Sequence, residues 1–130
     1  HWLRIVSQET PTWNYAVASE RELIGGIGLT PQTDIHRFSC EIGYWLGEPF
    51  WGQGIATQAV AAFSDYAVAT HRIARLFAGV FAWNPASARV LEHAGYTFEG
   101  RLRQHVYKEG RFVDQLLYAR VHPLPLSSAI

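Results

Sequence analysis

The sequence has one cysteine and no methionine. Because Cys40 has no second cysteine to pair with, the chain forms no internal disulfide, and we expect a cytoplasmic location. A natural reading frame would begin with methionine, whereas this chain begins at His1. We therefore expect that the natural start lies upstream and that part of the domain is missing from the front.

The sequence also lacks an excess of positive charge. Lys and Arg total 11, as do Asp and Glu, so the formal net charge is +0. Nucleic-acid-binding domains usually gather cations against phosphate, so we expect no nucleic-acid partner. No apolar run approaches the roughly 20 residues that span a bilayer, so we expect no membrane insertion. The six histidines show no metal-ligand spacing, and we expect no metal site.

What the sequence does have is apolar and aromatic mass. Hydrophobic residues make up 48% of the 130 residues and aromatic residues 14%, enough for one well-formed core. We expect residues 1–122 to form a single domain and residues 123–130 to form a loose tail.

Alternating and helical patterns predict the elements. Strands are expected at residues 13–18, 23–30, 38–46, 74–81, 96–107 and 111–121. One amphipathic helix is expected at residues 55–70, and a second follows Asn84-Pro85, an N-cap pattern, and ends before Gly95. The order β-β-β-α-β-α-β-β predicts an α/β or α+β class, with a mixed, mostly antiparallel sheet flanked by helices.

The glycine-rich loop at residues 47–54 (GEPFWGQG) lies between a strand and a helix. The first turn of a helix has unpaired amide hydrogens, and Gly52 and Gly54 allow an anion to approach the backbone. Residues 53–57 are therefore a candidate anion cradle, although a tight turn alone would also explain the glycines. No Gly-Lys-Ser/Thr sequence is present for a P-loop, and Thr57 stands where a dinucleotide-binding motif needs a third glycine.

Two motifs resemble the GNAT acetyltransferase superfamily. The run from Trp51 to Thr57 (WGQGIAT) is similar to the pyrophosphate motif of its RimJ/RimL-like branch of ribosomal-protein acetyltransferases. Residues 84–100 (NPASARVLEHAGYTFEG) resemble the helix and strand beside the pantetheine arm of the cofactor. The resemblance covers Trp13 to Val121. Trp51 replaces the Gln or Arg that commonly opens the motif, which implies phosphate contacts from backbone amides.

The resemblance implies the GNAT fold, without its first strand and helices, and acetyl-CoA as co-substrate. Strands 38–46 and 74–81 would run side by side and splay apart at one end. The pantetheine arm would pair with the backbone there, and Asn84 would contact it from the far side. The expected cofactor contacts are Tyr44, Trp45, Leu46, Gln53, Gly54, Ile55, Ala56, Thr57, Asn84 and Ser87.

The resemblance further implies direct attack by an amine on the thioester. Glu41 is the candidate general base, and its alternative is an ordinary surface glutamate on a strand. Leu91 stands where many members have a tyrosine acid, so Ser87 is the candidate donor to the leaving thiolate. A hydrogen bond of Ser87 to its own helix backbone is the equal alternative, and capping alone would explain Asn84.

The expected function is transfer of an acetyl group to a primary amine on a protein N-terminus or a small molecule. The alternative is a module that binds acetyl-CoA without turnover. An exposed sheet edge or apolar face would also favour a homodimer.

Overall fold

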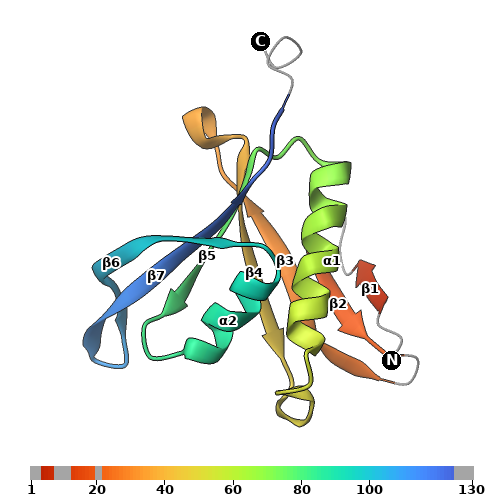
Figure 1. Ribbon diagram of the computed structural model, residues 1–130, viewed down its shortest axis with the longest axis horizontal. Coiled ribbons are helices and arrows are strands. Elements are labelled where there is room, and N and C mark those ends of the chain that lie inside the picture. The colour runs from red at the N-terminus through yellow and green to blue at the C-terminus, as the bar shows by residue number, and fades with distance from the viewer. Residues whose placement is uncertain (1–3, 8–12, 20–21, 125–130) are drawn as a thin grey trace.

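The computed structural model describes residues 4–7, 13–19 and 22–124. Seven strands form one sheet in the order β1-β2-β3-β4-β5-β7-β6 (Figure 1). They are β1 (Arg4–Ser7), β2 (Asn14–Ala18), β3 (Leu23–Pro31), β4 (Ser39–Leu46), β5 (Arg75–Phe81), β6 (Thr97–Lys108) and β7 (Arg111–Val121). The helices are α1 (Ile55–Thr70) and α2 (Pro85–His93), with short 3-10 turns η1 (Asp34–His36) and η2 (Glu48–Phe50).

Neighbouring strands are antiparallel everywhere except between β4 and β5, which are parallel. The sheet therefore consists of one antiparallel group, β1 to β4, and a second one, β5, β7 and β6. Helix α1 provides the crossover from β4 to β5, as a parallel connection requires. The predicted mixed, mostly antiparallel sheet is confirmed.

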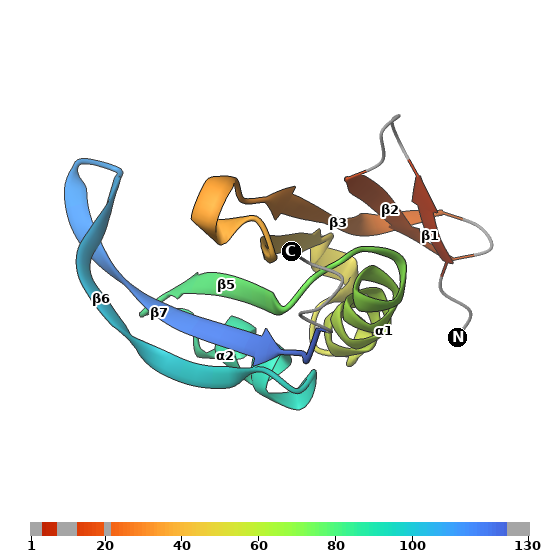
Figure 2. The same cartoon turned by 90° about the horizontal axis from the view of Figure 1, so that it is seen from above.

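Both helices pack on the same face of the sheet, as Figures 1 and 2 show. The apolar stripe predicted for α1 is confirmed, because Ile55, Val60 and Phe63 are all buried. Phe63 is fully buried and packs edge-on against Tyr15 of β2, with ring centroids 5.0 Å apart. Truncating a buried phenylalanine of this kind typically costs about 3–5 kcal/mol.

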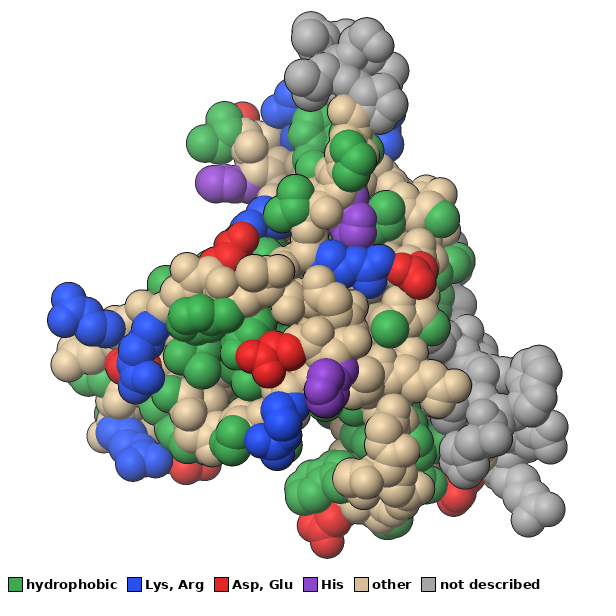
Figure 3. All heavy atoms as spheres, viewed as in Figure 1, with side chains coloured by type: hydrophobic (Ala, Val, Ile, Leu, Met, Phe, Trp, Pro, Cys, Tyr) green, Lys and Arg blue, Asp and Glu red, His purple; other side chains and the backbone are tan. Residues whose placement is uncertain are grey.

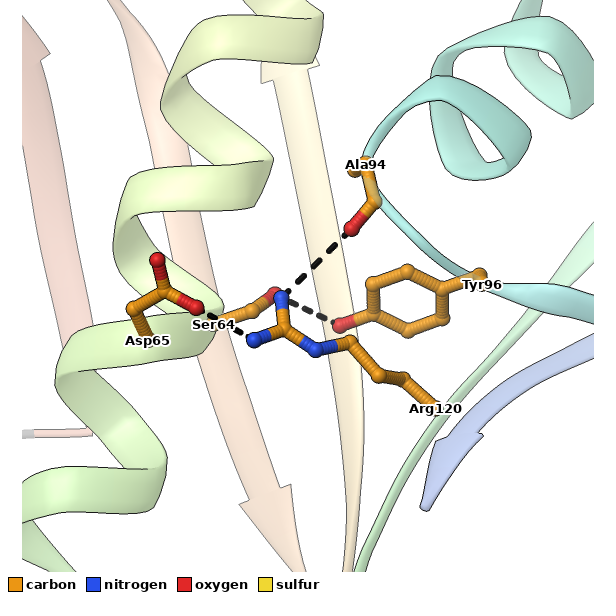
Figure 4. A network of polar contacts seen from close by, with 5 residues as sticks. All are labelled: Ser64, Asp65, Ala94, Tyr96 and Arg120. Atoms are coloured by element: carbon orange, nitrogen blue, oxygen red, sulfur yellow. Dashed lines mark hydrogen bonds and ion pairs between the residues drawn. The ribbon is translucent and has the colours of Figure 1, made fainter. Parts of the chain in front are cut away.

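A buried polar contact fixes α1 to the segment that follows α2 (Figure 4). Ser64 is fully buried in α1, and its hydroxyl lies 2.7 Å from that of Tyr96. Arg120 of β7 pairs with Asp65 and donates to the carbonyl of Ala94. Burial raises the pKa of Tyr96 to about 12, although the Ser64 hydrogen bond and the charge of Arg120 oppose that rise. The hydroxyl therefore stays protonated and available to Ser64.

The other face of the sheet has no helix packed on it among the described residues. There, η1 and the tip of the β6–β7 hairpin rise on the same side, away from both helices (Figure 2). This open face holds the alternate side chains of each strand, such as Glu41 between the buried Cys40 and Ile42.

The predicted elements agree with the structure, most of them to within a residue or two. Gly95 has a φ of 94°, the left-handed conformation expected after α2. β1 was not predicted. The proposed tail lies largely outside the described residues, because 125–130 are not described, so the domain boundary at residue 122 stays a prediction. Within the described part of the chain, neither helix combines the length and apolar character that crossing a membrane requires.

Candidate active site

β4 and β5 are paired over only the first part of their length. Their register joins Ser39 to Arg75 and Glu41 to Phe77. β4 then continues to Leu46, paired on its other side with β3, so beyond Glu41 its edge towards β5 has no strand partner in the described chain. Figure 1 shows the two strands together at one end and apart at the other. The predicted splay is confirmed.

The loop before α1 lies at the open end of this splay. Gly52 and Gly54 have φ values of 73° and 76°, a left-handed backbone that glycine adopts at little cost. Gly54 is the N-cap of α1, and no side chain in the described part of the chain caps the helix, so the amides of its first turn have no acceptor from the helix. These are the residues 53–57 that sequence reasoning singled out. Thr57 is half-buried within them.

Two side chains of the loop form hydrogen bonds to nearby backbone carbonyls. The indole nitrogen of Trp51 donates to the carbonyl of Leu46 at 2.7 Å, which ties the loop to the end of β4. The amide nitrogen of Gln53 donates to the carbonyl of Pro49 at 3.0 Å. The contact shows that Trp51 anchors the loop. Figure 3 shows a notch in the surface between this loop and the lobe that contains α2.

Ser87 lies in the first turn of α2, across the splay from β4. Its backbone N–H donates to the side chain of Asn84 at 3.2 Å, so Asn84 is a helix cap, as expected. Its hydroxyl lies 2.8 Å from the hydroxyl of Tyr44, with which it shares a hydrogen bond. Burial raises the pKa of Tyr44, and the Ser87 hydrogen bond partly offsets that rise. Two neutral hydroxyls therefore join the two arms of the splay on the helix-covered face.

Glu41 lies on the opposite, open face, at the last residue of β4 that pairs with β5. Its side chain is exposed and lines a cavity of about 380 Å³ with His36, Phe77 and His105. Within the described residues no ion pair involves Glu41. The carboxylate and the Tyr44–Ser87 pair thus flank the splay from opposite faces of the sheet.

A second cavity of about 430 Å³ lies beside it on the open face, over β2, β3 and β4. Trp45 lines it and is 58% exposed. Its indole lies above Gly26, where an added Cβ would come within 2.3 Å of the indole nitrogen. Trp45 therefore walls the open face and is not a core residue.

The structure places the predicted site residues along the splay, with Glu41 where the two strands part and residues 53–57 at the open end. It also adds features that the sequence did not reveal. The side chain of Tyr44 was not expected to bind Ser87, because residues 43 positions apart carry no local signal of contact. His36 and His105 were not singled out for the cavity at Glu41. The carboxylate of Asp114 binds Arg101 and the backbone of Gln104.

A family model described as "Acetyltransferase (GNAT) domain" matches residues 1–97. The chain belongs to this family. The GNAT domain is also 33% identical over 107 residues to the ribosomal-protein-serine acetyltransferase of Escherichia coli, covering 82% of this chain and 59% of the relative. The uncharacterized N-acetyltransferase YoaA of Bacillus subtilis is 34% identical over 111 residues, or 85% of this chain and 62% of YoaA.

Among solved structures, RimL, a ribosomal L7/L12 alpha-N-protein acetyltransferase in complex with coenzyme A, superposes on the GNAT domain with a TM-score of 0.76. The identity is 30%, and the match covers 83% of this chain and 60% of RimL. The chain thus spans about three fifths of the length of these relatives. The expected relation to the RimJ/RimL-like branch is confirmed.

Proposed function

We propose that this GNAT domain binds acetyl-CoA in the splay between β4 and β5 and transfers the acetyl group to a primary amine. The observation that carries the proposal is that two binding features lie close together. The unpaired edge of β4 and the uncapped N-terminus of α1 lie at the same open end of the splay.

Coenzyme A fits the chemistry of both features. Its diphosphate needs N–H donors and positive potential, which the first turn of α1 supplies through its amides and helix dipole. The residues for that contact are Gln53, Gly54, Ile55, Ala56 and Thr57. The amides of its pantetheine arm need a strand edge, which the backbone of Tyr44–Leu46 supplies, with Asn84 on the far side. RimL in complex with coenzyme A and MccE in complex with acetyl-CoA and AMP are structural neighbours.

Glu41 acts in this proposal as the base for the attacking amine, directly or through a water. An alkyl ammonium ion has a pKa of about 10, so it must lose a proton before its nitrogen can attack. Glu41 accepts that proton on the open face. The nitrogen forms a bond to the thioester carbon, the carbon–sulfur bond breaks, and the electron pair leaves with the sulfur.

Ser87 acts as the hydrogen-bond donor to the departing sulfur, which becomes the free thiol by taking up the proton that the nitrogen loses as it becomes an amide. Tyr44 supports Ser87: when the Tyr44 hydroxyl donates to Ser87 Oγ, the hydrogen of Ser87 is free for the sulfur. Base and donor on opposite faces of the sheet suit an attack in which the amine enters from one side and the thiolate leaves on the other. Holding two reactants in line in this way contributes up to about 7–11 kcal/mol in well-oriented systems.

Calorimetric titration of the purified chain with coenzyme A and with acetyl-CoA tests the binding step. We expect saturable binding of both, and no heat with either on folded protein would refute the proposal. Thiol release from acetyl-CoA with a panel of amines tests the transfer. The panel should include peptides with free N-termini, because one relative is a ribosomal-protein-serine acetyltransferase. It should also include small amines, the other acceptor class expected from the sequence.

Binding without thiol release for any amine would instead favour the alternative, a binding module without turnover. Whether the chain forms a homodimer stays a prediction that light scattering can test on the same sample.

A further inference from the structure

The edge strand β6 contains a wide bulge opposite Asp114. Leu102 pairs with Gln115 of β7 and Val106 pairs with Val113, so the three residues 103–105 face Asp114 alone. Gln104 has a φ of 51°, a left-handed conformation that costs a residue with a side chain about 1–3 kcal/mol. Such a backbone persists only where neighbouring contacts stabilise it.

The carboxylate of Asp114 supplies those contacts. One oxygen accepts the backbone N–H of Gln104 at 2.8 Å, and the other accepts Nε of Arg101 at 2.7 Å. These hydrogen bonds hold the pKa of Asp114 below its ordinary value, and the bond from Gln104 has the largest effect. The backbone carbonyl of Asp114 also accepts from Ala82 at 3.2 Å, which ties the bulge to the end of β5.

The bulge changes which side chains share a face. In a regular strand, residues 102 and 105 would point to opposite faces, because side chains alternate. Here both Leu102 and His105 line the cavity that contains Glu41. A bulge that redirects a side chain into a cavity is a frequent device beside active sites.

Glu41 is the one carboxylate among the described residues that line the cavity, and no ion pair of the described chain involves it, so it can receive an ammonium ion. Arg75 also lines it, but its guanidinium forms a two-point ion pair with Glu99 at 2.7 and 3.0 Å. Phe77 and Leu117 add apolar surface. The imidazole of His105 offers one donor and one acceptor when neutral, so it suits a carbonyl or hydroxyl group near the reacting amine.

We propose that His105 is a specificity-determining residue that binds a carbonyl or hydroxyl group of the acceptor beside its amine, and that Asp114 is its positioning residue. This inference rests on the proposed function, since it places the acceptor next to Glu41. It predicts a preference for amines with such a group, for example amino-acid amides, over plain alkylamines that lack it.

Two conjugates of coenzyme A test the proposal. In each, the sulfur is joined through an acetyl group to an amine, glycinamide in the first and ethylamine in the second. Calorimetry measures the affinity of each conjugate and of acetyl-CoA. For His105→Ala we expect about a threefold to tenfold loss of affinity for the glycinamide conjugate, the worth of one hydrogen bond. The ethylamine conjugate and acetyl-CoA should bind as they do to the wild type.

Three further variants separate positioning from folding. Asp114→Asn should show the same selective loss, because the amide has a single acceptor oxygen for two donors. Gln104→Gly should bind as the wild type, since glycine adopts the left-handed conformation without strain. His93→Ala removes an exposed histidine on α2, on the helix-covered face, and should change nothing.

An equal loss for both conjugates in His105→Ala, or no loss, would overturn the role of His105. A loss in Asp114→Asn that extends to acetyl-CoA would show that Asp114 is merely structural. If acetyl-CoA does not bind the wild type, it is the proposed function that fails, so the two failures are distinguishable.

Discussion

The left-handed glycine at the start of α1 allows a prediction with a defined magnitude. Gly54 has φ 76° and ψ 3°, and a Cβ added there would meet no atom within 4 Å. The cost of Gly54→Ala therefore comes from the backbone conformation alone, about 1–2 kcal/mol of unfolding free energy. For a domain of this size that corresponds to a fall in Tm of about 4–8 °C.

The same substitution tests the anion cradle. If the loop relaxes to relieve the strain, the amides of the first turn change direction and the diphosphate loses contacts. We expect the affinity for coenzyme A to fall about tenfold, as for one charge-assisted hydrogen bond. Urea unfolding and calorimetry on the same preparation measure the two effects.

Gly100→Ala is the matched control, because a Cβ there also meets no atom within 4 Å and its φ is not left-handed. We expect it to be neutral or slightly stabilising. The reasoning is wrong if Gly54→Ala behaves like Gly100→Ala in both assays.

Three further predictions concern the polar groups. Glu41→Gln should lower kcat about a hundredfold near neutral pH and leave the affinity for acetyl-CoA unchanged. If the pH–rate profile of the variant is the same as that of the wild type, Glu41 is not the base. Ser87→Ala and Tyr44→Phe should each lower kcat about tenfold. The fall in kcat of the double variant should be smaller than the product of the two single falls, because the two side chains share one hydrogen bond. A fall equal to that product would contradict the coupling. Because the pKa of Tyr96 is raised to about 12 in the folded state, the buried neutral hydroxyl contributes fully to the free energy of unfolding below pH 10. As the pH rises towards 12, that free energy should fall by up to about 2–3 kcal/mol. Tyr96→Phe should flatten that decline in urea unfolding, and parallel curves would disprove it.

Much of the fold was predictable because its signals are local. The stripe of Ile55, Val60 and Phe63 has the helical period, and Asn84-Pro85 and Gly95 mark the two ends of α2. β1 escaped prediction because it is only four residues long, too short for an alternating pattern to stand out.

The candidate site was predictable in its backbone but not in its side-chain contacts. The glycine loop was predictable because a left-handed backbone favours glycine, and the glycines are visible in the sequence. The Tyr44–Ser87 hydrogen bond and the cavity shared by Glu41 and His105 depend on which strands lie together and on an irregular register. The bulge in β6 interrupts the alternation of side chains between the two faces, so the sequence pattern does not predict which face His105 occupies.

The parallel contact between β4 and β5 has a mechanical consequence. Every other neighbour in the sheet is antiparallel, whereas these two strands share three residue pairs before they diverge. The sheet therefore consists of two antiparallel groups of strands that are joined by three residue pairs and connected by helix α1. A molecule bound in the splay, beyond those pairs, would contact both antiparallel groups of strands, so its binding should slow amide hydrogen exchange in both groups together.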